Sequence, residues 1–369
     1  MKICFLADST SAHTKKWCDY FLSRGYEIII ISLTDGNIPG CKVYNFNVGE
    51  TIYNNDIKKL FSYFGKIKRV KNIIKEEKPD IVHAHYATSY GLLGSLVNFK
   101  PYILSVWGSD VYDFPRRSFI HRGLLKYNLK KPSVIMSTSN DMKDEIQKYT
   151  NRDIMVTYFG VNPNIFKPIP NLKNNNIFTV GTIKSLFKIY GLEYLLKAFK
   201  ELTDKYKNDK FKLIIAGKGE EEENLKKLSK ELGIDKLVDF KGFLKKDELV
   251  NTYNQMDIAV FPSLQESFGV SAVEAQSCGV PVVCSNVGGL PEATNPGYSS
   301  ILVEPKNTNE LFKALEKLYL NKELRENMGK NGRKYVLERF VIEENFAKID
   351  GVYQSFKRRN RWDIWERLL

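Results

Sequence analysis

The sequence predicts an α/β protein of two domains, each built on a parallel sheet with helices on both faces. Short apolar, β-branched runs such as Glu27–Ser32 alternate with amphipathic helical segments along the chain, a pattern typical of strands that are buried on both faces. A proline-rich segment in mid-chain separates two such series. The length of 369 residues is also that of two domains.

The first series runs from the N-terminus to Ser137. A short helix over Trp17–Arg24 is expected to end at Gly25. Apolar residues recur at three- and four-residue spacing from Ile57 to Ile74, which predicts a long helix. Strands are predicted over Lys2–Ala7, Glu27–Ser32, Asp80–His83, Tyr102–Val106 and Val134–Ser137.

Three prolines and several asparagines between Gly160 and Asn176 predict a linker. The second series is expected to comprise Ile177–Gly181, Leu192–Leu202, Lys212–Ala216, Glu222–Leu232, Val238–Lys241, Asp247–Met256, Asp257–Pro262, Val270–Cys278 and Pro281–Ser285. We place the domains at 1–165 and 166–340. The tail, 341–369, is expected to be helical and to pack back on the first domain, with Trp362 and Trp365 against the body.

Composition excludes several classes of protein. Apolar residues make up 43% of the chain and aromatic residues 12%, which excludes a disordered protein. No window approaches the roughly 18 uninterrupted apolar residues of a spanning helix. The apolar run before Asp8 is too short for a secretory signal, and the scattered cysteines are expected to be reduced thiols in a cytoplasmic protein. Five scattered cysteines and four histidines predict neither a disulfide framework nor a zinc site.

The positive charge is concentrated in one region. The chain carries a net charge of +13, and residues 56–131 hold 15 Lys+Arg against 6 Asp+Glu. Such a patch can face nucleic acid, an anionic bilayer or a phosphorylated substrate, or it can be an ordinary solvated surface. No helix-turn-helix, zinc motif or aromatic platform is evident, so no nucleic-acid partner is expected.

The stretch Ala259–Glu274 carries the most chemical information. A strand leads through a loop into a helix that is expected to begin at Gly269. The first N–H groups of a helix are unpaired and partly positive, so this helix start suits an anion such as a diphosphate. Glu266 and Glu274 flank it, and their carboxylates can accept hydrogen bonds from sugar hydroxyls. Either acid alone reads as a surface residue, whereas the pair in this context favours a binding site.

Glycines and lysines follow other predicted strands of the second domain. Lys184 and Lys188 come after its first strand, where a lysine suits a diphosphate leaving group. Carboxyl ends of parallel strands lie at one edge of a sheet, so the strand-end glycines are expected to line that edge. They are Gly181, Gly217, Gly242 and the pair Gly288-Gly289.

These motifs carry a family resemblance that covers nearly the whole chain. PSLQESFGVSAVEAQSCGVPVV, with its E-x7-E pair, resembles the donor-binding signature of retaining GT-B glycosyltransferases of family 4. VGTIKSLFKIYGLEYLLKAF, LIIAGKGEEEENL and FKGFLKKDEL resemble other blocks of that family. SAHTKKWCDYFLSRGYEI, DIVHAHYATSYGLLG and SVWGSDVY resemble a subgroup met among surface-polysaccharide transferases. The resemblance implies two Rossmann-like domains that face a central cleft, with the acceptor on 1–165 and the nucleotide sugar on 166–340.

The resemblance also implies roles for individual residues. Glu274 would accept hydrogen bonds from the donor ribose, and Glu266 would contact hydroxyls of the transferred sugar. Lys188 or Lys184 would neutralise the diphosphate. Further donor contacts are implied for Gly181, Gly217, Ser267, Phe268, Gly269 and Val270, with Gly242 and Phe243 beside the nucleobase.

The sequence departs from the family pattern at three places. Thr182 stands where the family has an arginine, and Lys184 is the candidate to replace it. The first loop has Ser11, Ala12 and His13 in place of a glycine pair, and Trp107 stands where a histidine is common. The residue that contacts the acceptor is therefore left open among Asp110, which is the catalytic candidate, and His13, His85 and Trp107.

The family implies transfer of a hexose-type sugar, with retention, from a nucleotide diphosphate to a glycan or a polyprenyl-diphosphate-linked acceptor in cell-surface polysaccharide synthesis. The resemblance to the family favours a UDP-sugar as the donor. Helix-end N–H groups and a lysine can stabilise the leaving diphosphate, and no Asp-x-Asp motif is present. No metal and no cofactor are therefore expected.

The basic region suggests a membrane hypothesis. Phe61, Tyr63 and Phe64 lie among its lysines, so it is a candidate to rest on an anionic membrane at the inner face of the cell, although the same stripe can equally be core. Two other functions stay open at this point. They are a nucleotide-sugar epimerase on the same architecture and a basic protein that binds nucleic acid or membrane.

Overall fold

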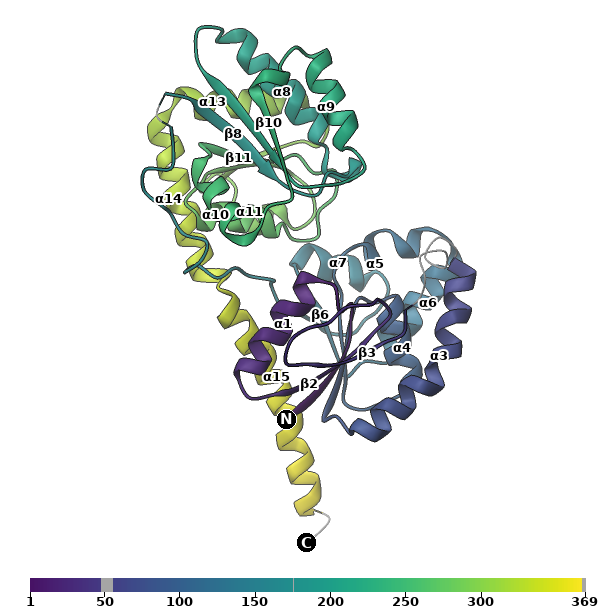
Figure 1. Cartoon of the computed structure of the whole chain (residues 1–369). Coiled ribbons are helices and arrows are strands. Elements are labelled where there is room, and N and C mark those ends of the chain that lie inside the picture. Colours follow the sequence, from purple (N-terminus) through teal and green to yellow (C-terminus); the bar gives the residue numbers. More distant parts are fainter. Residues whose placement is uncertain (48–55, 175, 367–369) are drawn as a thin grey trace. The chain divides into compact units, whose positions relative to one another are not determined.

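The computed structural model describes residues 1–47, 56–174 and 176–366; the side chains of 56–62, 64 and 358–366 are outside the description. The chain divides into two compact units (Figure 1). The first consists of Met1–Thr157 together with Glu343–Leu369, and the second of Tyr158–Ile342.

The first unit is a doubly wound sheet. In the described part of this unit, seven parallel strands follow the order β3-β2-β1-β4-β5-β6-β7. They are β1 Lys2–Leu6, β2 Glu27–Ser32, β3 Lys42–Asn45, β4 Ile81–His85, β5 Tyr102–Ser105, β6 Val134–Ser137 and β7 Ile154–Val156. The helices are α1 Ala12–Ser23, α3 Asp56–Glu77, α4 Ser89–Val97, α5 Ser109–Tyr112, α6 Phe119–Lys130, α7 Asn140–Gln147 and α15 Ile342–Glu366, with a 3-10 turn at Phe114–Arg116.

Alternate residues of β1 enter two different cores. Cys4 and Leu6 join the core beneath α3, α4 and α6. Phe5 points the other way and meets Trp17 of α1 at 6.1 Å between ring centroids. Both faces of the strand are thereby removed from water, which is why the sequence reads as a continuous apolar run.

The C-terminal helix α15 packs against this second face, beside α1 (Figure 1). The Phe346 ring lies 5.3 Å from that of Trp17. The Tyr353 hydroxyl hydrogen-bonds Nδ1 of the buried His83 at 2.6 Å, and Nε2 of that ring bonds the Ser105 hydroxyl at 2.8 Å. Trp362 lies in α15 as well, but its side chain and that of Trp365 are outside the described residues.

The second unit repeats the architecture with a smaller sheet. In its described part, six parallel strands follow the order β10-β9-β8-β11-β12-β13. They are β8 Phe178–Ile183, β9 Phe211–Ala216, β10 Val238–Gly242, β11 Ile258–Phe261, β12 Val282–Ser285 and β13 Ser300–Val303. The helices are α8 Leu192–Lys205, α9 Glu222–Glu231, α10 Lys246–Gln255, α11 Val270–Ser277, α12 Leu290–Thr294, α13 Thr308–Leu320 and α14 Lys322–Arg339, with 3-10 turns at Lys188–Tyr190 and Asp235–Leu237.

The predicted series of strands and helices is therefore present in both units. The strands that were not predicted share one property. β3, β7 and β13 lie at sheet edges. An edge strand has one neighbour and is more exposed, so its sequence is shorter and less apolar. The helix α1 also begins earlier than Trp17, because the Ser11 hydroxyl accepts a hydrogen bond from the His13 N–H at 3.2 Å.

The segment predicted as a linker is packed on the second unit. The Val161 N–H donates to the Phe340 carbonyl at 2.8 Å, and the Ile342 N–H donates back to Val161 at 3.0 Å. Phe166 is buried, and its carbonyl accepts from the Ser277 hydroxyl at 2.5 Å. The prolines prevent regular structure but do not release the chain, so the units divide before Tyr158 and not after residue 165. Among the described helices, none has the length and apolar character that a bilayer crossing requires.

Candidate active site

The carboxyl ends of the second sheet carry four loops that contact one another. We call residues 184–187, 217–219, 262–269 and 286–289 the strand-end loops. The Lys184 N–H donates to the Ala216 carbonyl at 2.9 Å, and the Gly217 N–H donates to the Gly242 carbonyl at 2.7 Å. The Gly289 N–H donates to the Glu266 carbonyl at 3.1 Å. The predicted strand-end turns thus form a backbone framework of two hydrogen-bonded groups, the turns after β8, β9 and β10 and the turns after β11 and β12.

Two glycines make this framework possible. A Cβ at Gly217 would overlap the carbonyl oxygen of Lys184, and a Cβ at Gly288 would overlap that of Glu266. Both glycines also have positive φ, at +137° and +52°, which side chains disfavour. The glycines therefore fix the backbone of the two residues whose side chains carry opposite charge.

Lys184 and Glu266 form an ion pair within this framework. The Lys184 Nζ lies 2.5 Å from Glu266 Oε2, and the side chains are only 12% and 10% exposed. The same Nζ lies 4.4 Å from the ring centroid of Tyr190, within cation–π range. The ammonium is consequently held between a carboxylate and an aromatic face.

Glu274 belongs to the same electrostatic group. Burial opposes the charged form of Lys184, but Glu266, Tyr190 and Glu274 outweigh burial and raise the pKa of the ammonium. The lysine therefore stays charged although it is shielded from water. Because both carboxylates act on one ammonium, the predicted E-x7-E pair converges on one place.

Glu274 lies in α11 and is held by a residue of α10. Its carboxyl is nearly buried, and the Tyr253 hydroxyl of α10 donates to its Oε2 at 3.2 Å. Tyr253 itself is fully buried, and burial followed by the Glu274 charge raises the pKa of its phenol well above the ordinary value. Tyr253 therefore remains a hydrogen-bond donor to the carboxylate.

The helix α11 begins where the sequence predicted. Gly269 precedes its first residue with φ at +102°, and the first turn contains no acidic residue. Phe268 is buried just before it and stacks on Tyr158 at 5.4 Å. The N-terminal N–H groups of α11 are thus fixed next to Glu266, and they add partial positive charge to the Lys184 ammonium.

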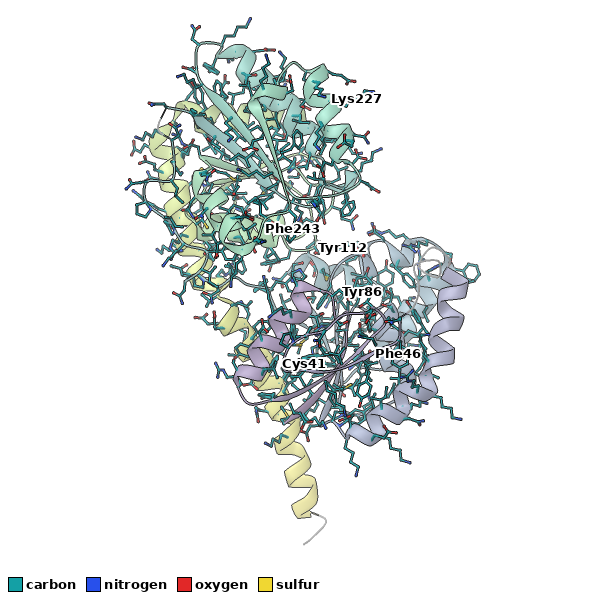
Figure 2. All side chains as sticks on the ribbon, in the orientation of Figure 1. Cys41, Phe46, Tyr86, Tyr112, Lys227 and Phe243 are labelled. Atoms are coloured by element: carbon teal, nitrogen blue, oxygen red, sulfur yellow. The ribbon has the colours of Figure 1, made fainter. Side chains whose placement is uncertain are left out.

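The remaining predicted residues of this domain occupy different environments. Phe243 follows β10 and is 74% exposed (Figure 2), so its ring is accessible to a planar ligand. Lys188 lies on an exposed 3-10 turn. Gly181 is not at a strand end: β8 continues to Ile183, and a Cβ at Gly181 would overlap the Met256 side chain. The prediction that the strand ends at Gly181 is therefore wrong, and this glycine makes room for core packing.

Asp110 of the first unit holds a loop. It is fully buried, and its carboxylate accepts from the N–H groups of Ala87 at 2.6 Å, Gly108 at 2.7 Å and Trp107 at 3.3 Å. Burial raises its pKa to about 6, against the lowering effect of these backbone bonds. We interpret Asp110 as a residue that positions the loops after β4 and β5.

His85 lies in an aromatic cage. It is buried among Phe5, Trp17 and Trp107, whose rings are 5.0, 4.7 and 4.7 Å away. Burial and then His13 lower its pKa to about 3, so the ring is neutral. His13 and Trp107 are partly exposed at the same sheet edge, with rings 5.8 Å apart. Of the histidines predicted on the acceptor side, His13 is accessible and His85 supports Trp107 from behind.

Sequence reasoning missed three tyrosines. Tyr190 lies under Lys184, and Tyr253 holds Glu274. Tyr86, labelled in Figure 2, follows β4 with φ at +83°, an unusual value for a bulky residue, and its hydroxyl bonds that of Ser109. Tyr86 could have been found because it directly follows a predicted strand. Tyr190 could have been found from its Lys-x5-Tyr spacing after Lys184. Nothing in the sequence pairs Tyr253 with Glu274.

Two Rossmann-like units, one with a charged, glycine-framed strand edge, are an architecture suited to an enzyme that binds a nucleotide sugar. The family model described as Glycosyl transferases group 1 matches residues 164–335, and the model described as Glycosyl transferase 4-like matches residues 2–139. An uncharacterized glycosyltransferase of Methanocaldococcus jannaschii is 31% identical over 289 residues, which cover 77% of this chain and 78% of that protein. The chain belongs to this glycosyltransferase family and is a transferase that uses nucleotide-sugar donors.

Two further proteins are similar over most of the chain. The capsular polysaccharide biosynthesis glycosyltransferase CapM of Staphylococcus aureus is 24% identical over 372 residues, which cover 93% of each chain. The crystal structure of Anabaena HepE in complex with UDP-glucose superposes with a TM-score of 0.79 at 20% identity, over 96% of this chain and 100% of that chain. The structural similarity confirms the predicted GT-B fold class.

Proposed function

We propose that this enzyme transfers a hexose-type sugar, with retention of configuration, from a UDP-sugar to a glycan or polyprenyl-diphosphate-linked acceptor in cell-surface polysaccharide synthesis. One observation carries the donor half of the proposal. A shielded lysine, two carboxylates and a helix N-terminus converge at one strand edge. These groups match, in sign and type, the diphosphate and hydroxyls of a nucleotide sugar.

The similar proteins support the choice of donor and acceptor. HepE is described in complex with UDP-glucose, which supports a UDP-hexose. CapM is described as a capsular polysaccharide biosynthesis enzyme, which supports a surface-glycan acceptor. For this chain, we assign the ribose to Glu274, the transferred sugar to Glu266, and the base to the exposed ring of Phe243.

Of the two candidate lysines, we assign the diphosphate to Lys184. A cation that is shielded from water interacts more strongly with a phosphate than one on an exposed turn. Lys184 meets this condition at 12% exposure and lies beside Glu266, whereas Lys188 is exposed. The backbone N–H groups at the start of α11 complete the anion site, and this arrangement needs no metal or other cofactor.

Retention follows from a displacement on one face of the sugar. The acceptor hydroxyl attacks C1 as the bond from C1 to the diphosphate oxygen breaks, and the hydroxyl proton passes to a leaving phosphate oxygen. Glu266 is a poor nucleophile because its Oε2 lies 2.5 Å from an ammonium. A covalent glycosyl-enzyme on Glu266 is therefore disfavoured.

The donor assignment is tested by thermal shift with a panel of nucleotides and nucleotide sugars, because a ligand of the folded state raises its apparent stability. We expect UDP and one UDP-hexose to stabilise wild-type protein. Glu274→Gln should abolish most of this shift, and Tyr253→Phe should reduce it. Lys188→Ala serves as the matched control for Lys184→Ala, since the two lysines belong to the same loop region.

The reaction itself is tested with the identified donor and a lipid-linked saccharide, with a water-soluble sugar or polyol phosphate offered in parallel. NMR of the product gives its anomeric configuration. An inverted product would refute retention. Transfer to the soluble acceptor alone would exclude the lipid-linked assignment and leave the donor site unaffected.

A further inference from the structure

The helix α6 presents two adjacent apolar residues to solvent. Phe119 is 84% exposed and Ile120 is 62% exposed. They occupy the first positions of the helix, where Ser118 caps the backbone by accepting from the His121 N–H. Leu125 and Leu129 of the same helix are fully buried in the core. The inner side of the helix is therefore packed, while Phe119 and Ile120 at its start remain in solvent.

Basic residues surround this tip. Between Phe114 and Lys131 the sequence contains six Lys and Arg residues and no Asp or Glu. Arg122, Lys126 and Lys130 are exposed, and their helical spacing places them on the arc that also contains Phe119. The Lys131 ammonium lies 5.3 Å from the ring centroid of Tyr127, which is itself partly exposed. We call Phe119 and Ile120 with these basic residues the α6 face.

The basic surface continues across the same layer of helices. The helix α4 packs between α3 and α6 on one face of the sheet (Figure 1). On α3, the described residues Lys68, Arg69, Lys71 and Lys75 are exposed. The outer side of this layer of helices therefore carries many exposed basic residues around the apolar pair Phe119 and Ile120.

Tyr63 of α3 does not provide exposed apolar surface. The membrane hypothesis from the sequence relied on Phe61, Tyr63 and Phe64. Tyr63 is buried in the core with Val70 and Ile73, so its part of the stripe packs inward. The side chains of Phe61 and Phe64 are outside the described residues. Among the described side chains of α3, α4 and α6, the exposed large apolar ones lie on α6.

We propose that the α6 face docks on an anionic phospholipid bilayer, with Phe119 and Ile120 inserted at the headgroup boundary and the surrounding Lys and Arg residues on the lipid phosphates. Apolar insertion and attraction to anionic lipid act together in such a contact. This inference deepens the proposed function, because a polyprenyl-diphosphate-linked acceptor resides in a membrane. It does not depend on which residues bind the donor.

The test is sedimentation of the full chain with vesicles of phosphatidylcholine alone, and with vesicles in which about a third of the lipid is phosphatidylglycerol. We expect binding to the anionic vesicles only. The double variant Phe119→Ser/Ile120→Ser should weaken partitioning at least about tenfold, since each large apolar side chain contributes substantially when buried. Arg122→Glu/Lys126→Glu should weaken it about tenfold or more.

Matched controls come from the second unit. Leu320→Ser changes an apolar residue that is 63% exposed, and Lys227→Glu changes a lysine whose side chain is 79% exposed. Neither control should alter partitioning. All replaced side chains are exposed, so circular dichroism and the melting temperature should match wild type.

The proposal is overturned by equal binding to both vesicle types, by unchanged binding of the Phe119/Ile120 variant, or by an equal loss in the Leu320 variant. It is also overturned if the wild type is a dimer without lipid and the Phe119/Ile120 variant is a monomer, because the face would then be a protein interface. The UDP-induced thermal shift is measured on every variant. Failure of the wild type to bind anionic vesicles, with an intact shift, contradicts docking alone, and absence of the shift in wild type contradicts the proposed donor.

Discussion

Replacing Lys184 by methionine is the most informative single change, because it separates the structural role of this lysine from its proposed role toward the diphosphate. Methionine keeps most of the side-chain length and removes the charge. Glu266 then remains only 10% exposed without its cationic partner. Both stability and turnover should therefore fall, for different reasons.

The stability effect follows from the geometry of the pair. Two unit charges about 3 Å apart attract by roughly 5 kcal/mol at an effective dielectric constant of about 20. Desolvation of both groups offsets most of this attraction, so the net value of the pair is small. Removal of one partner leaves a shielded carboxylate, which costs about 2–3 kcal/mol here, below the value for full burial. The second unit should melt roughly 5–10 °C lower.

The double variant Lys184→Met/Glu266→Gln isolates the catalytic effect. It contains no unpaired charge, so its free energy of unfolding should return to within about 1 kcal/mol of wild type. Turnover should stay about 10²–10³-fold below wild type, because one stabilising group for the leaving diphosphate is absent. The assay is initial-rate transfer with the identified UDP-sugar at saturation, alongside thermal melts.

Two results would refute this reasoning. A Lys184→Met variant that melts with wild type would mean that the ion pair does not form in solution. A double variant with wild-type turnover would mean that Lys184 has only a structural role. Glu266→Gln alone completes the cycle and shows whether the two residues act as a unit.

Four other changes test separate parts of the structure. Phe243→Ala should weaken UDP binding about tenfold by calorimetry without altering the melting temperature, since base stacking on an exposed ring is lost; unchanged affinity would remove Phe243 from the site. Burial raises the pKa of Asp110 from 3.8 to about 6, so the folded chain retains a proton that the unfolded chain has released. The free energy of unfolding should therefore fall as pH rises from about 4 to about 6. In Asp110→Asn, the free energy of unfolding measured by urea titration at each pH should lack this decrease. Gly288→Ala should destabilise by at least about 2 kcal/mol because its Cβ meets the Glu266 carbonyl, while Gly351→Ala, which meets open space in α15, should stabilise by about 0.5–1 kcal/mol.

The local parts of the site could be predicted from the sequence. The order strand, loop, helix around Glu266 and Glu274 is encoded within a few residues by an apolar run, a glycine and helical periodicity. β11 and α11 accordingly lie where expected. Gly217 and Gly288 could be recognised as turn residues, although their close contacts with Lys184 and Glu266 could not.

The long-range parts could not be predicted. Lys184 and Glu266 are 82 positions apart. They meet because β11 pairs with β8 in the sheet, although β10 is the strand that precedes it in the chain. That order depends on how helices cover both faces of the sheet, which no local pattern states. Gly181 was misassigned for a related reason: the strand extends two residues further, so the glycine faces Met256 within the unit.

The ion pair also explains how this site can keep a cation shielded from water before any donor arrives. An isolated ammonium at such low exposure would be costly and would tend to lose its proton. Glu266, Tyr190 and Glu274 together keep the Lys184 pKa high, so the charge is present when a diphosphate approaches. Under the proposed function, the phosphate oxygens then take over part of the contact with Lys184. Glu266 is thereby released to accept hydrogen bonds from the sugar, so binding of the phosphate end and positioning of the sugar end are coupled through one side chain.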